Sequence, residues 1–119
     1  MPHGKTDIYA ASDVIGDRVR NMDGEDVGKI EDLVIDPEEG RIAYAVLSFG
    51  GVLGMGDKYF AIPWHSLRPG SDEKEFMVDI DKDRLKNAPG FDKDHWPRPN
   101  DRKWLGEVYG FYNEKKYWH

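Results

Sequence analysis

The chain has 119 residues, the usual length of one domain with one hydrophobic core, and its 39% hydrophobic and 34% charged residues are typical of a soluble globular protein. It has no cysteine, which excludes disulfides and thiolate metal sites. The longest apolar stretch, Ile42–Leu47, is far too short to cross a bilayer, and Met1–Lys5 is not followed by the apolar segment of a signal peptide. We therefore expect a cytoplasmic protein without a membrane span, or a soluble part of a larger assembly.

The net charge of −6 is unevenly distributed along the chain. Residues 1–90 hold 18 acidic and 11 basic side chains, a net −7, whereas residues 91–119 hold 5 acidic and 6 basic side chains, a net +1. An acidic body repels phosphate backbones, and no cluster of Lys and Arg forms a basic patch in the sequence. The charge distribution therefore disfavours a nucleic-acid partner.

The first third of the chain predicts a leader and two strands. Residues 1–11 offer little to bury, so we expect a flexible leader. A short strand is expected at Arg18–Asn21, and the Asp-Gly pair within Met22–Asp26 predicts a turn because these residues tolerate positive φ. A longer strand follows at about Val27–Ile35. The acidic segment Asp36–Gly40, with its Pro and Gly, predicts a solvated turn whose carboxylates stay ionised, which excludes acid–base catalysis there.

The strand expected at Arg41–Phe49 is the strongest in the sequence, and both of its faces are apolar. Alternation places Ile42, Tyr44 and Val46 on one face, and the other face is formed by Ala43, Ala45, Leu47 and Phe49. Such a strand is expected to be buried on both sides. One face would line the core, and the other would be covered by the C-terminal tail or by another subunit.

The segment Gly50–Gly56 holds four glycines and three apolar residues, Val52, Leu53 and Met55. A phosphate-binding loop would lead into a helix, whereas this segment leads into a strand, so a hairpin connection is favoured. Its apolar residues could insert into a partner or a second subunit.

The remaining elements are short. The sequence predicts a strand at Lys58–Pro63, a helical turn at Trp64–Leu67, a polar turn at Arg68–Lys74, a strand at Glu75–Ile80 and a short helix from its cap Asp81 to about Asn87. Strands joined by short turns indicate an antiparallel all-β domain, and about five short strands suit a closed barrel better than a sandwich.

The order of these elements resembles the PRC-barrel family over roughly residues 12–91. Four segments carry the resemblance: Val14–Asn21, Gly24–Asp36, Ile42–Leu47 and Gly50–Trp64. The resemblance implies a small antiparallel β-barrel with short helical turns. Such barrels occur in the cytoplasmic part of the H subunit of photosynthetic reaction centres and in the C-terminal half of a ribosome-maturation factor.

In those settings the barrel serves as a docking surface, and the family shares no catalytic motif. The chain lacks both the membrane helix of the H subunit and the N-terminal domain of the maturation factor, so neither specific role is carried over. The resemblance therefore implies a module without enzymatic activity.

Few residues qualify as a site. The spacing of Asp79, Asp81 and Asp83 is similar to the start of a calcium loop, but Arg84 and Gly90 stand where a glycine and an acidic ligand are required. No residue is therefore assigned to a metal, to a cofactor or to catalysis.

The best local candidate is a barrel-mouth site at Trp64 and His65, an aromatic and a titratable group at a strand end. The alternative is that Trp64 plugs the barrel and His65 caps it.

The C-terminal extension, residues 92–119, is unusually aromatic: residues 91–119 hold 8 of the 15 aromatic side chains. Trp104, Leu105, Val108 and Tyr112 follow helical spacing, although glycines at positions 106 and 110 weaken that helix. So many large rings are costly to leave in water. The extension is therefore expected to pack either on its own barrel or on a second subunit, with the aromatic rings as anchors.

Together these features lead to a ranked set of functional hypotheses. The first is a homodimeric PRC-barrel module that acts through protein contacts with an unidentified partner. The alternatives are a small ligand bound at the barrel mouth, and an RNA- or ribosome-associated role that rests on fold analogy alone. The candidate interface residues are Tyr44, Val46, Val52, Leu53, Met55, Trp104, Leu105, Val108, Tyr109 and Tyr112.

Overall fold

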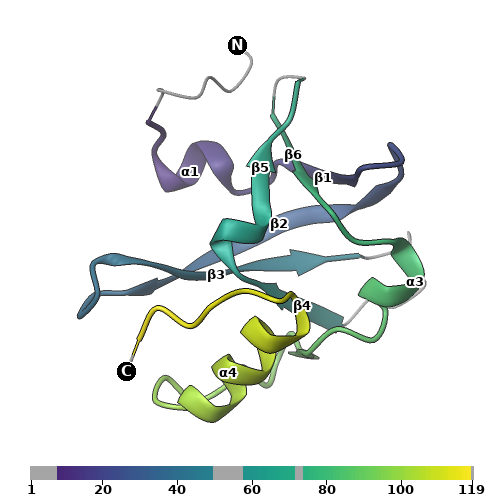
Figure 1. The fold of residues 1–119 in the computed structure, drawn as a ribbon. Helices are drawn as coiled ribbons and strands as arrows, with labels where there is room; N and C mark the ends of the chain where they lie inside the picture. Colours follow the sequence, from purple (N-terminus) through teal and green to yellow (C-terminus); the bar gives the residue numbers. More distant parts are fainter. Residues whose placement is uncertain (1–7, 50–57, 72–73, 119) are drawn as a thin grey trace.

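The computed structural model describes residues 8–49, 58–71 and 74–118, which form one sheet with four short helical elements (Figure 1). The predicted segment Gly50–Gly56, with Val52, Leu53 and Met55, lies outside the described residues, as does the leader up to residue 7. The strands are β1 (Arg18–Asn21), β2 (Asp26–Asp36), β3 (Arg41–Ser48), β4 (Lys58–Ile62), β5 (Leu67–Pro69), β6 (Glu75–Val78) and β7 (Gly90–Asp92). The helical elements are α1 (Ala11–Val14), the 3₁₀ turn η1 (Trp64–Ser66), α3 (Lys82–Leu85) and α4 (Arg102–Phe111).

The sheet has the order β5-β6-β1-β2-β3-β4-β7, and one of its pairs is parallel. Strands β1 and β6 run in the same direction from Arg18↔Glu75 to Asn21↔Val78, whereas the other pairs are antiparallel. The prediction of a wholly antiparallel domain is therefore wrong at this pair. The reason is that η1 bends the chain between β4 and β5 without reversing its direction, so both strands run opposite to β1. Strand β6 then forms a hairpin with β5 and therefore runs parallel to β1.

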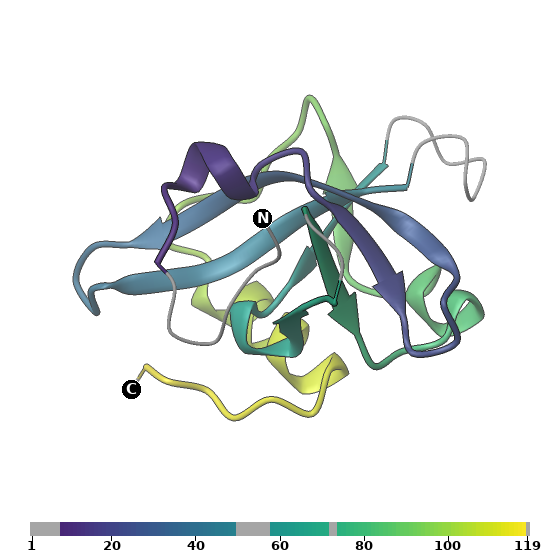
Figure 2. The same cartoon turned by 90° about the horizontal axis from the view of Figure 1, so that it is seen from above.

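The sheet does not close into a barrel within the part of the chain that the structure describes. Its end strands, β5 and β7, do not pair with each other, and Figure 2 shows a strongly twisted, open sheet. Both end strands contain only three residues, and β5 ends at Pro69, which has no backbone N–H to donate. The chain therefore presents little free edge at either end of the sheet.

The concave side of the sheet holds the main core. Val19, Ile30, Leu47 and Phe60 are almost completely buried there, together with residues from β5, β6 and α3. The core requires a close approach between strands at Gly28, whose φ is +123° and where a Cβ would collide with the carbonyl of Ser48 and the ring of Phe49.

The opposite side of β3 and β4 is covered by the C-terminal extension, which forms a second core. Leu105, Val108 and Tyr109 of α4 pack on Tyr44 and Val46, with Ala43, Ala61 and Phe91 around them. The prediction that the strand Arg41–Phe49 is buried on both sides is confirmed.

The assignment of its faces is wrong at one end, because the register shifts between Val34↔Tyr44 and Ile35↔Ile42. This bulge places Ala43 in the second core and turns Ile42 toward Trp64 on the concave side.

None of the helices within the described residues is long and apolar enough to span a membrane.

Candidate functional site

The extension is tied to the tip of the β2–β3 hairpin by Asp36. The side chain of Asp36 is only 3% exposed, and its Oδ2 accepts hydrogen bonds from the hydroxyl of Tyr117 at 2.7 Å and from Arg102 at 3.0 Å. Its Oδ1 accepts from the backbone N–H of Glu39. The hydroxyl of Tyr117, followed by the Arg102 guanidinium, lowers the pKa of Asp36 to about 2. We call this group of Asp36, Arg102 and Tyr117 the clasp.

The prediction that the whole acidic turn is solvated is therefore wrong for Asp36. Its partners lie 66 and 81 residues further along the chain, so no local pattern could reveal them. The neighbouring carboxylates at positions 38 and 39 are exposed, as predicted.

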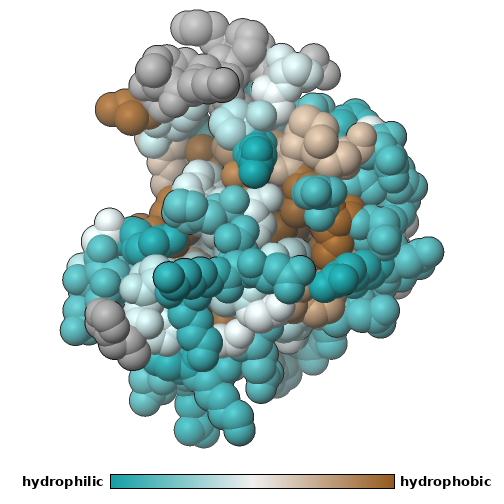
Figure 3. Space-filling view, in the orientation of Figure 1, coloured by the Kyte–Doolittle hydropathy of each residue, from teal (hydrophilic) through white to brown (hydrophobic). Residues whose placement is uncertain are grey.

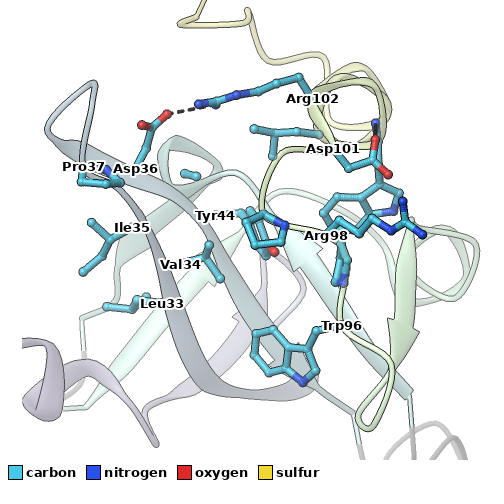
Figure 4. A pocket seen from close by; sticks show the side chains of 15 residues that line it. Leu33, Val34, Ile35, Asp36, Pro37, Tyr44, Trp96, Arg98, Asp101 and Arg102 are labelled. Atoms are coloured by element: carbon cyan, nitrogen blue, oxygen red, sulfur yellow. Dashed lines mark hydrogen bonds and ion pairs between the residues drawn. The ribbon is translucent and has the colours of Figure 1, made fainter.

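Beneath the clasp lies an open groove with a volume of about 670 Å³. Figure 4 shows that the hairpin forms one wall and that the segment from Trp96 to Arg102 forms the other, with the Asp36–Arg102 ion pair across one end. Most of the lining side chains are apolar: Leu33, Val34, Ile35, Pro37, Ala43, Tyr44, Trp96, Pro97, Pro99, Trp104 and Leu105.

Trp96 is held in a fixed position although it is 42% exposed. Its indole N–H donates to the carbonyl of Lys93 at 2.8 Å, and its ring packs on Phe91 and Tyr59 with centroid distances of 5.0 and 6.1 Å. A large ring that is rigid before binding loses little conformational entropy when a partner covers it.

Three polar groups in the groove wall have no hydrogen-bond or ion-pair partner within residues 8–49, 58–71 and 74–118. They are the hydroxyl of Tyr44, the indole N–H of Trp104 and the guanidinium of Arg98. Among the described residues, the fully buried side-chain atoms without a partner are Arg41 Nε and the Tyr112 hydroxyl, so the three groups of the groove keep some contact with solvent. Burial, with a contribution from Asp32, raises the pKa of Tyr44 to about 12, so its hydroxyl keeps its proton at neutral pH.

The other charged groups of the groove are already engaged. Asp36 and Arg102 belong to the clasp, and Asp101 accepts a hydrogen bond from the backbone N–H of Trp104 as the N-cap of α4. The polar groups of the walls without a partner are therefore mainly hydrogen-bond donors, and the second carboxylate oxygen of the exposed Asp101 is an acceptor.

The model of the PRC-barrel domain matches residues 6–85. The chain belongs to the PRC-barrel family. No curated protein matches the sequence. The groove of this PRC-barrel protein is composite, because its hairpin wall lies within the matched residues and its second wall lies beyond them, at residues 96–105.

The candidate interface residues fall into two groups in the PRC-barrel structure. Val46, Val108 and Tyr109 are at most 2% exposed and lie in the second core, so in this arrangement a partner cannot reach them. Leu105 belongs to the same core and also lines the groove. Tyr44 and Trp104 line the groove, and Tyr112 packs between the two cores. The sequence left both alternatives open, packing on the same chain or on a second subunit, because a ring buried in a core and a ring buried at an interface look alike in a sequence.

The predicted barrel-mouth site is divided between two cavities. Trp64 lines an apolar cavity of about 430 Å³ with Leu33, Ile42 and Leu67. His65 lines a polar cavity of about 410 Å³ that also contains Arg68. Figure 3 shows apolar surface beside α1 and along β6, whereas hydrophilic side chains cover the extension below.

Sequence reasoning missed Asp36, Trp96, Arg98 and Arg102 as site residues. The available signal was the segment Trp96-Pro97-Arg98-Pro99, in which prolines stiffen the chain before the cap of a helix. In the described part of the chain, no group of three or more His, Asp or Glu side chains could hold a metal ion.

Proposed function

We propose that this PRC-barrel protein is a module without catalytic activity that works by binding another protein in the groove between the β2–β3 hairpin and the segment Trp96–Arg102. The observation that carries the proposal is the half-exposed ring of Trp96, held in place on one wall of an open apolar groove whose other wall carries Ile35, itself 64% exposed. Exposed apolar rings that are held in place are typical anchors of protein interfaces.

The chemistry of the walls supports binding rather than catalysis. The carboxylate of Asp36 is held in the clasp, and its lowered pKa makes it a poor general base. The exposed carboxylate of Asp101 serves as the N-cap of α4. The volume of about 670 Å³ suits a short segment of a partner better than a broad, flat interface.

Affinity capture from cells that produce the protein tests this proposal. The parent chain is compared with Arg98→Ala and Trp96→Ala, and with the control Arg68→Ala, which removes another exposed arginine that lines a different cavity. We expect the parent and Arg68→Ala to retain the same proteins, and the two groove variants to lose them at least about threefold. If all four chains capture the same proteins equally, the groove is not the binding surface.

A second candidate function is the binding of a small apolar ligand in the cavity beside Trp64. Its support is that the walls are apolar, with Val14, Leu67 and Phe76 next to the indole. Titration with an apolar fluorescent probe tests it: Trp64→Ala is expected to weaken binding, and Trp96→Ala to leave it unchanged. Equal binding by the parent and Trp64→Ala would exclude this cavity as the site.

A further inference from the structure

The groove offers more free hydrogen-bond donors than acceptors. Tyr44, Arg98 and Trp104 each contribute a donor that has no partner in the described part of the chain, whereas the carboxylate of Asp36 is in use and the exposed carboxylate of Asp101 already accepts one hydrogen bond as the cap of α4. A ligand that fits such walls must bring acceptors. It gains little from donors of its own, because a donor that is buried without a partner weakens binding.

A proline-rich segment has this composition. In the polyproline II conformation the backbone makes no internal hydrogen bonds, so every carbonyl is free to accept. Proline has no backbone N–H, so the same segment brings almost no unpaired donors into the groove.

The apolar part of the groove fits the same ligand. Trp96 and Ile35 lie on opposite walls of the groove, and flat aromatic rings are the surfaces on which pyrrolidine rings pack in the recognition of such segments. The extended proline helix is already ordered before binding, which lowers the entropic cost of filling an open groove.

The surrounding charge adds a preference for the flanks of the segment. Glu38 and Glu39 follow Pro37 at the hairpin tip, are exposed, and have no side-chain partner among the described residues. The net charge of the chain is −6. Lysine or arginine next to the prolines is therefore favoured over acidic residues.

We propose that the groove formed by Tyr44, Trp96, Arg98 and Trp104 binds proline-rich segments of partner proteins in the polyproline II conformation, with basic flanking residues preferred. This inference rests on the proposed function, because it names the class of partner that the same groove takes.

Selection from a displayed library of random peptides tests the preference for proline-rich segments separately from the proposed function of the groove. The parent is used as bait in parallel with Arg98→Ala and with the control Arg68→Ala. Because Arg98 is exposed and has no partner in the described chain, its substitution is not expected to affect folding. We expect the parent and Arg68→Ala to select sequences with at least two prolines, and Arg98→Ala to bind the selected peptides about 3- to 10-fold more weakly.

The outcomes differ for the two proposals. Selected peptides that depend on Arg98 but contain no excess of proline overturn this inference and leave the proposed function standing. Peptides that bind all three baits equally, or no selected peptides at all, overturn both. Trp96→Ala, checked by thermal unfolding, is a second groove variant, and undiminished binding of a proline-rich peptide by a folded Trp96→Ala also overturns the inference.

Discussion

At the scale of single residues, the carboxylate of Asp36 joins the hairpin to the extension. We expect Asp36→Asn to lower the free energy of unfolding by about 2 kcal/mol at neutral pH, because the charged hydrogen bonds to Tyr117 and Arg102 are weakened. The pKa of Asp36 is about 2 in the folded chain, against 3.8 for an ordinary Asp. The stabilisation is therefore present above about pH 4 and is lost as the pH falls toward about 2.

Urea unfolding of the parent and of Asp36→Asn, measured at about pH 6 and about pH 2, tests this expectation. The difference in stability between the two chains should shrink at the lower pH. A difference that is the same at both pH values would show that the charge of Asp36 does not stabilise the fold.

The hydroxyl of Tyr109 has a different role, because it donates to the backbone carbonyl of Ala43 where the pairing of β3 with β4 has ended. We expect Tyr109→Phe to cost about 2 kcal/mol, since it leaves a buried carbonyl without a donor. Tyr59→Phe is the matched control, because the half-buried Tyr59 makes no side-chain hydrogen bond within the described residues. If both substitutions lowered the midpoint temperature of thermal unfolding equally, this role of the Tyr109 hydroxyl would be contradicted.

At the scale of elements, α4 carries a glycine that its packing does not need. Nothing lies within 4 Å of the position that a Cβ on Gly110 would take, and its φ is not positive. Gly110→Ala should therefore stabilise the chain by about 0.5–1 kcal/mol. Chemical denaturation measures this change, and a destabilised Gly110→Ala would contradict the expectation.

Gly28→Ala is the opposite case, because the Cβ would collide with the backbone of Ser48, and we expect a loss of stability of about 3 kcal/mol or more. Chemical denaturation measures this loss as well.

How far the sequence predicts each element depends on the range of the interactions that form it. Strands β2 and β3 follow from alternation and from the turn at Pro37, and the cap of α3 follows from Asp81, because these signals are local. Strands β5 and β7 were missed, because elements of three residues that contain Pro69 or Gly90 resemble turns. Their existence depends on pairing with strands that are distant in the sequence.

The same limit applies to the candidate site. Helical spacing pointed to Trp104 and Leu105, and alternation pointed to Tyr44, so one part of the groove was visible. Spacing alone could not decide that Leu105 would face the second core, or that Arg102 would meet Asp36. Both results depend on how α4 lies across the sheet, which is a tertiary property.

At the scale of the whole molecule, the C-terminal extension is a second layer on the PRC-barrel sheet. Deletion of residues 98–119 uncovers Tyr44 and Val46 and removes three buried side chains of α4. Each large buried side chain that is lost costs about 2–5 kcal/mol, so we expect the truncated chain to unfold or to aggregate. Circular dichroism and light scattering measure this, and a folded truncated chain with unchanged stability would contradict the account.

The homodimer stays a prediction. The outer face of β3 is covered by the α4 of the same chain, so association through this face requires two copies to exchange their extensions. In that case light scattering of the intact protein would give the mass of two chains at micromolar concentration. The mass of a single chain would exclude the exchange.

The most direct test of the groove as a binding site for proline-rich segments is a two-dimensional ¹H–¹⁵N NMR titration of the intact protein with a lysine-flanked oligoproline peptide. We expect saturable shifts of the Trp104 indole N–H and of the backbone amides of the non-proline residues among 33–37 and 96–102, with no change near His65. Absent shifts, or shifts confined to the cavities beside Trp64 and His65, would contradict it.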